Sequence, residues 1–324
     1  MNSMVKTKKT DEEFYHENLQ SYIENGKALS IIDPDVVNEY GNHSVLKLIC
    51  MHYWIGFFCP ICYKNLKEPY GYNLAYIDTM AGTGVTANRD GNNHFCGSCT
   101  GAIIRSSILN KPFDLIIAVE SDRIRAETLY KRISSIFSTG STMVYSDPLE
   151  SVAETIVQFI NSQKKKIVSY TVIDPEGFEG LTWGAIFPLL SCKGDAMITW
   201  FEDGAWRIKQ AAIQEHRTAE GQAKKMEELL GPGWKTANTP NDLTQMFIRR
   251  IQNIPGKEAV GKVKISQGNG SSYYMLLFSR SKNDPIVKNW ESEVTRRLSS
   301  VDKDNLSLLL EVESGRQKTL FGFK

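Results

Sequence analysis

Five short apolar runs, separated by helical segments, constrain the fold of this chain more than any other feature. They are "NLAYID" (73–78), "DLIIAVE" (114–120), "STMVYSD" (141–147), "SYTVIDP" (169–175) and "GDAMITWFE" (194–202). Strands that alternate with helices predict an α/β fold with a doubly wound, mostly parallel sheet. Residues 261–281 read as two further strands joined by a glycine-rich turn, so we expect a C-terminal antiparallel hairpin.

Four of these runs carry an acidic residue at or just past the carboxyl end. The residues are Asp78, Glu120, Asp147 and Asp174. Ligands of open α/β sheets bind beyond the carboxyl ends of the strands, so we expect these carboxylates to lie around one site. A parallel sheet that ends in a hairpin resembles the Rossmann-like fold of class I S-adenosylmethionine-dependent methyltransferases. The resemblance implies that S-adenosylmethionine is the cofactor.

The stretch "YIDTMAGTGVTA" (76–87) is the first candidate for cofactor binding. Gly82 and Gly84, with Ala81 beside them, allow the backbone to turn sharply after a strand and to approach a ligand closely. A dinucleotide fingerprint would need a third glycine at position 87, where the chain has alanine. Asp78 suits a methionine ammonium group or a bound water. The alternative is a tight strand-to-helix turn that binds nothing.

Glu120 and Asp147 are the next candidates along the chain. A carboxylate at the position of Glu120 can accept both hydroxyls of a ribose, in NAD as in S-adenosylmethionine. Asp147 is placed to accept from an adenine amino group. Either acid alone could instead be a helix N-cap. The ordered set of three acids favours a ligand.

The stretch "VIDPEGF" (172–178) follows the fourth strand and predicts the catalytic residues Asp174, Pro175 and Phe178. Amino-methyltransferases have Asp or Asn, two prolines and an aromatic residue here, which hold the target amine toward the methyl group and so act by positioning. In this chain Glu176 replaces the second proline and Phe178 is displaced by one residue. The departure at Glu176 argues against an adenine N6 target. A proline-capped turn is the alternative.

The ordered blocks "YIDTMAGTG", "CGSCTGAI", "VESD" and "IDPEGFEGLTWGAI" resemble the three-Cys-motif partner proteins over roughly residues 46–281. The resemblance implies a methyltransferase fold and a partner protein with a three-cysteine motif. The pair "DTMAGTG" and "DPEG" is also similar to ribosomal RNA methyltransferases that use DxFxGxG with DPPY.

The cysteines include two CxxC pairs, Cys59 with Cys62 and Cys96 with Cys99. Four such thiolates could form a tetrahedral zinc site. The pairs are separated by a whole strand, which favours reduced structural cysteines. We therefore predict no metal site, with zinc as the weaker hypothesis.

Composition sets a few limits on partners and location. A net charge of +1 argues neither for nor against nucleic acid, and the run Lys164–Lys166 is either a solvated surface or a phosphate contact. The polar N-terminus does not resemble a signal peptide, and the apolar stretch 45–62 contains a lysine and a histidine. We expect a buried helix there, no membrane partner and a cytoplasmic protein with reduced cysteines.

The C-terminus, "SGRQKTLFGFK", is apolar where a free end is usually polar. Gln317, Leu320, Phe321 and Phe323 match peptides that bind sliding clamps, and a tail packed on its own domain is the alternative. We expect a helical segment (1–60), a methyltransferase domain (61–300) and a clamp-binding tail (301–324). The predicted activity is methylation of a base amine in DNA. An RNA base methyltransferase and a non-catalytic S-adenosylmethionine-binding subunit are the alternatives.

Overall fold

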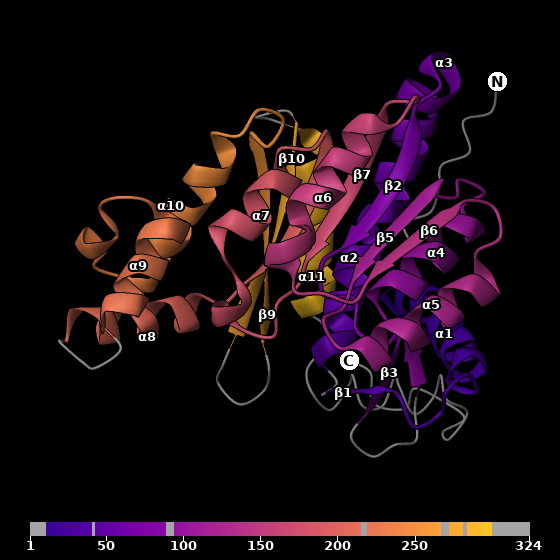
Figure 1. The fold of residues 1–324 in the computed structure, drawn as a ribbon, viewed down its shortest axis with the longest axis horizontal. Helices are drawn as coiled ribbons and strands as arrows, with labels where there is room; N and C mark the ends of the chain where they lie inside the picture. Colours follow the sequence, from indigo (N-terminus) through magenta and orange to yellow (C-terminus); the bar gives the residue numbers. More distant parts are fainter. Residues whose placement is uncertain are drawn as a thin grey trace.

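A seven-stranded sheet forms the centre of the protein (Figure 1). The computed structural model describes residues 11–40, 43–88, 94–214, 219–266, 272–280 and 284–299. The strand order is β6-β5-β2-β7-β8-β10-β9, and β10 runs in the opposite direction to the other six strands of this sheet. The predicted mostly parallel sheet with a C-terminal hairpin is confirmed. The strands are β2 (Asn73–Asp78), β5 (Leu115–Val119), β6 (Ser141–Tyr145), β7 (Ile167–Ile173), β8 (Gly194–Trp200), β9 (Ala259–Ser266) and β10 (Ser272–Ser279).

Helices cover both faces of this sheet, as a doubly wound fold requires. One face packs against α1 (Asp11–Ser30), α2 (His43–Cys62), α4 (Ser98–Ile108), α5 (Arg123–Ile136) and α11 (Pro285–Ser299). The other packs against α6 (Leu149–Ser162), α7 (Trp183–Leu190), α8 (Glu202–Ile213), α9 (Ala219–Leu230) and α10 (Pro240–Gln252). Short helical turns are η1 (Tyr63–Lys67), α3 (Glu68–Tyr70), η2 (Phe178–Gly180) and η3 (Trp234–Thr236).

Helix α2 belongs to the core of this domain. The Tyr170 hydroxyl of β7 donates to the Met51 carbonyl at 3.1 Å, and the Trp54 ring meets the Trp290 ring of α11 edge to face. The segment 44–70 is long and apolar enough to cross a membrane, but 67% of its most apolar window is buried inside the protein. Its packing is that of a core helix, and the expected domain boundary at residue 60 lies within it.

A second, three-stranded sheet lies beside the first and has no counterpart in the sequence prediction. Its order is β1-β3-β4, with β1 (Asn38–Tyr40), β3 (Val85–Asn88) and β4 (His94–Cys96). Strand β3 directly follows the glycine-rich turn, and it pairs with β1 in parallel and with β4 antiparallel. The turn therefore leads into a strand before the chain reaches α4.

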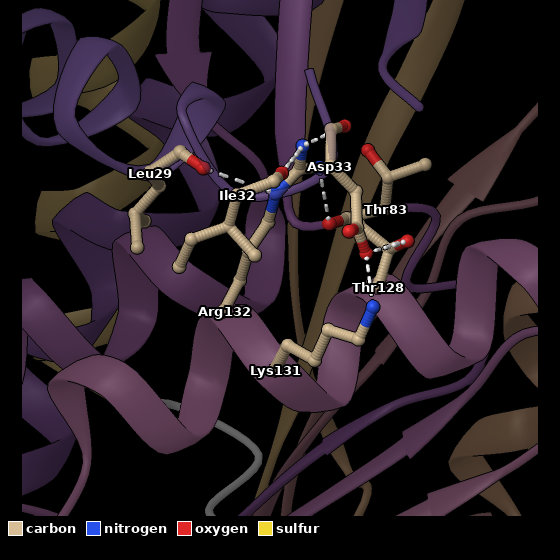
Figure 2. Close-up of polar contacts among 7 residues, drawn as sticks. All are labelled: Leu29, Ile32, Asp33, Thr83, Thr128, Lys131 and Arg132. Atoms are coloured by element: carbon tan, nitrogen blue, oxygen red, sulfur yellow. Dashed lines mark hydrogen bonds and ion pairs between the residues drawn. The ribbon is translucent and has the colours of Figure 1, made fainter. Parts of the chain in front are cut away.

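Arg132 of α5 connects the N-terminal segment to the glycine-rich turn (Figure 2). Its guanidinium donates to the carbonyls of Leu29 (3.2 Å), Ile32 (2.7 Å), Asp33 (3.2 Å) and Thr83 (2.9 Å). The side chain is fully buried, and this burial lowers the arginine pKa to about 10. One side chain thus satisfies carbonyls from the end of α1, the loop after it and the turn.

Replacing Arg132 should cost stability because four carbonyls would lose their charged donor. We expect Arg132→Met to lower the free energy of unfolding by about 3 kcal/mol or more. The adjacent Lys131→Met is the control, since Lys131 is exposed and makes one ion pair with Asp33 at 2.8 Å; its effect should stay below about 1 kcal/mol. Urea denaturation measures both, and equal losses would contradict the role assigned to Arg132.

Candidate functional site

A cavity of about 690 Å³ opens at the carboxyl ends of β2, β5, β6 and β7. This is the edge where the sequence predicted a ligand site. The predicted site residues that line the cavity are Gly82, Glu120, Asp147, Asp174 and Pro175. Asp78, Ala81, Gly84 and Phe178 do not line it. The cavity therefore unites residues from four strand ends but leaves out part of the predicted set.

The glycine-rich turn brings backbone to the wall of the cavity. Gly82 has a φ of 60° and Gly84 a φ of 78°, both in the left-handed region that favours glycine. A Cβ at Gly82 would also collide with the side-chain amide of Asn38 in β1. The Ala81 amide donates to the Val119 carbonyl at 2.9 Å. Ala81 and Gly84 thus help to set the conformation of the turn without lining the cavity, whereas Gly82 lines it.

Asp78 is fully buried beneath this turn. Its carboxylate accepts from the Ser98 hydroxyl at 2.5 Å and from the Met80 amide at 3.4 Å. Burial raises the pKa of Asp78 to about 7, and the charge of Asp174 adds to the shift. The neighbouring Thr79 does line the cavity, and its buried hydroxyl has no hydrogen-bond partner among the described residues. A role of Asp78 in cofactor binding stays a prediction.

The raised pKa of Asp78 predicts a pH dependence of stability. The folded protein holds a proton on Asp78 up to about pH 7, whereas the unfolded chain releases it near pH 4. Stability due to this group is therefore present below about pH 4 and is lost as pH rises to about 7. We expect the melting temperature of Asp78→Asn, relative to that of the wild type, to increase as the pH rises from about 4 to about 7.

Thermal melts of both proteins at several pH values test this. The exposed Asp203, changed to asparagine, is the control. A difference between Asp78→Asn and wild type that does not vary with pH would contradict the assignment.

Glu120 and Asp147 lie on the wall formed by β5 and β6. One carboxylate oxygen of Glu120 accepts from the Asp122 amide at 3.0 Å, and Asp122 in turn caps α5 through the Arg125 amide at 2.9 Å. The other oxygen of Glu120 has no partner within the part of the chain that the structure describes. Asp147 is exposed at the cavity. Both acids can accept hydrogen bonds from a ligand.

Asp174 is held through both of its carboxylate oxygens. Oδ2 pairs with the Lys47 ammonium of α2 at 2.6 Å, and Oδ1 accepts from the Thr199 hydroxyl of β8 at 2.6 Å. Both charged side chains are mostly buried, with 17% of Lys47 and 13% of Asp174 exposed. Sequence reasoning missed Lys47, because no motif links it to a strand end more than a hundred residues away.

Phe178 is buried away from the cavity. Its ring packs edge-on against Trp200 with the ring centroids 5.5 Å apart. The chain enters the short helix η2 directly after Glu176 and Gly177, and this turns Phe178 into the core. Two other aromatic residues line the cavity instead, Phe201 after β8 and Tyr273 in β10. Their only sequence signal is their position at the ends of predicted strands.

The cavity wall is acidic. Its carboxylates outnumber its two cations, Lys47 and Arg125. The negative potential suits a ligand that carries positive charge and disfavours phosphate. The acidic residues are Glu120, Asp122, Asp147, Glu150, Asp174 and Glu176.

The cysteines are not gathered into a metal site. Among the described residues, no group of three or more His, Cys, Asp or Glu side chains could hold a metal ion. All six cysteines are buried with free thiols. Burial raises the pKa of Cys62 and of Cys96 to about 12 each. The zinc hypothesis gains no support.

Comparison with known proteins gives likeness of structure only. No protein-family model and no curated protein matches the sequence. Trm1 from Pyrococcus horikoshii, solved with S-adenosyl-L-methionine, has 11% identity and a TM-score of 0.40 over 81% of this chain and 59% of its own. A human methyltransferase 10 domain containing protein has 10% identity and a TM-score of 0.33 over 72% of this chain and 82% of its own. At these values neither neighbour supports a function, which has to be argued from the site.

Proposed function

We propose that this chain is an S-adenosylmethionine-dependent methyltransferase that acts in the cytoplasm on a base amine of DNA. One observation carries the proposal. The cavity at the carboxyl ends of the parallel strands unites a glycine turn, Glu120, Asp147 and the Asp174–Pro175 pair in the order along the sheet that such an enzyme needs.

The residues of the cavity fit this cofactor. Gly82 lines the cavity with no side chain of its own, and the Thr79 hydroxyl is a buried polar group without a partner among the described residues. The acidic wall complements a ligand that carries a sulfonium and an ammonium group. Glu120 can accept from ribose hydroxyls and Asp147 from an adenine amine. When bound, the cofactor supplies an activated methyl group.

Asp174 acts in this proposal by holding the acceptor amine. Lys47 and Thr199 fix both carboxylate oxygens, so Asp174 presents its remaining lone pairs in a set direction. A hydrogen bond from the amine to Asp174 then turns the nitrogen lone pair away from the carboxylate and toward the methyl donor. Because the gain is one of orientation, Asp174 need not take a proton in the rate-determining step.

Substitutions at Asp174 separate positioning from base catalysis. Asp174→Asn keeps an oxygen acceptor and should retain part of the methyl transfer, whereas Asp174→Ala should lose at least about two powers of ten. Both variants should bind S-adenosylhomocysteine like the wild type in calorimetric titration. Equal activity losses would exclude positioning, and a wild type that binds NAD but not S-adenosylhomocysteine would refute the proposed cofactor.

The acidic wall also limits how a nucleic acid can approach. Phosphates are repelled there, so a target base has to enter the cavity without its backbone, as in enzymes that flip a base out of the stack. An RNA base methyltransferase meets this condition as well. A non-catalytic S-adenosylmethionine-binding subunit, working with a three-cysteine-motif partner, is the second candidate, because Glu176 stands where amino-methyltransferases have proline.

The modified nucleosides found in DNA and in RNA distinguish these functions. Total DNA and RNA from cells with the gene, without it, and with Asp174→Ala in its place would be digested and compared by mass spectrometry. A methylated base present only with the wild-type gene identifies the substrate. A methylated base that persists with Asp174→Ala would favour the subunit function.

The preference for DNA depends on the C-terminal tail, which lies outside the described residues. We propose that Gln317, Leu320, Phe321 and Phe323 bind a sliding clamp, with about 1.5–3 kcal/mol from each buried apolar side chain, offset by the ordering of the peptide. Deletion of residues 316–324 should leave melting temperature and cofactor affinity unchanged but abolish co-migration with the clamp of the same organism. A melting temperature lower by several degrees would instead assign the tail to the core.

A further inference from the structure

A second concave surface lies at the opposite end of the sheet from the cavity. It has a volume of about 720 Å³ and is formed where the chain enters β2, β7 and β8. Tyr70 and Tyr72 line it together with Lys164–Lys166 and Lys193. We call these residues the basic groove. The strands between the two sites have six or seven residues, so the sites lie about 20 Å apart.

The cations of the basic groove are not neutralised by the part of the protein that the structure describes. All four lysines are exposed, and none of them forms an ion pair with another described residue. Two carboxylates on adjoining segments already have cationic partners: Asp114 pairs with Lys67 at 2.6 Å and Glu68 with Lys111 at 3.3 Å. Unpaired cations held together on a concave surface produce a positive potential that attracts anions.

Two tyrosines lie among these cations. The Lys193 ammonium donates to the Tyr72 hydroxyl at 2.8 Å and lies 4.3 Å from the centroid of that ring. The pKa of Tyr72 is lowered, chiefly by this hydrogen bond, and the charges of Lys166 and Arg280 act in the same direction. Tyr70 is 74% exposed, so its ring is accessible to a ligand.

We propose that the basic groove binds the phosphate backbone of a single-stranded segment of nucleic acid, with Tyr70 stacked on a base. Lysines that follow a backbone, beside an open aromatic ring, are the combination by which proteins hold single strands without reading their sequence. A membrane surface fits less well, since the groove is concave and Tyr70 is its one exposed large hydrophobic residue among those described. An acidic peptide would use the lysines but would not need Tyr70.

This inference goes beyond the proposed methyl transfer and does not require it. The two sites have opposite charge, and the sheet separates them. A nucleic acid that occupies both has to pass along the side of the domain, so the groove would hold a part of the substrate remote from the target base. The cavity then selects the base, and the groove supplies affinity that is independent of sequence.

Salt dependence of binding tests the groove without any assay of methylation. Fluorescence anisotropy would measure the affinity of the full-length protein for labelled single-stranded DNA and RNA of about twenty nucleotides at several salt concentrations. Lys164→Gln, Lys166→Gln and Lys193→Gln together should reduce the slope of log affinity against log salt by about 2, since each single-strand phosphate contact contributes about 0.7. Tyr70→Ala should weaken binding several-fold and leave the slope unchanged, because stacking releases no counterions.

A matched triple variant controls for total charge. Lys27→Gln, Lys224→Gln and Lys235→Gln remove the same charge from exposed positions outside the groove and should change the slope little. Equal slopes for the two triple variants would overturn the proposal. It would also be overturned if polyglutamate of equal charge bound as tightly as the oligonucleotides and Tyr70→Ala had no effect. Titration of the same variants with S-adenosylhomocysteine keeps a failure here distinct from a failure of the proposed cofactor.

Discussion

The buried guanidinium of Arg132 is the interaction on which the geometry of the cavity depends. A glycine turn can adopt many conformations, and its usefulness to a ligand depends on which one is held. Here Arg132 holds the turn in one conformation. Its guanidinium donates to the Thr83 carbonyl within the turn and to carbonyls at the end of α1 and in the loop after it. Its burial is costly, as the lowered pKa shows, and only the full set of acceptors compensates for it. The N-terminal segment is therefore a structural part of the candidate site.

The main sheet and the position of the site could be predicted because their signals are local. An apolar run that ends in an acid, such as 73–78, specifies a buried strand and the side chain at its end with no knowledge of the rest of the chain. The carboxyl ends of parallel strands meet at one edge of a sheet, so the acids were expected to lie together there. Asp78 shows where this reasoning stops. Its position at a strand end was predicted, but the Ser98 hydroxyl that engages it comes from a helix twenty residues later and leaves the carboxylate outside the cavity wall.

The features that were missed depend on contacts between distant segments. Strand β1 pairs with β3 across more than forty residues, and its three residues are too few to show a pattern. Phe178 was assigned by analogy with a motif that has a second proline. With Glu176 there, the backbone turns into η2 and the aromatic ring leaves the cavity. The ion pair of Lys47 with Asp174 likewise joins positions that no spacing rule connects.

The ion pair between Lys47 and Asp174 gives helix α2 two functions. Its apolar face contacts β7 and α11 through Met51 and Trp54, so its place on the sheet is set by packing. Lys47 lies one turn before Met51 and reaches the end of β7, where Asp174 stands. Because the helix is rigid and its core contacts are extensive, the ammonium group is delivered to the carboxylate with little freedom. A lysine on a mobile segment would lose backbone entropy as well on forming the same pair. The apolar character that makes this helix resemble a membrane span is thus what fixes the charged pair at the edge of the cavity.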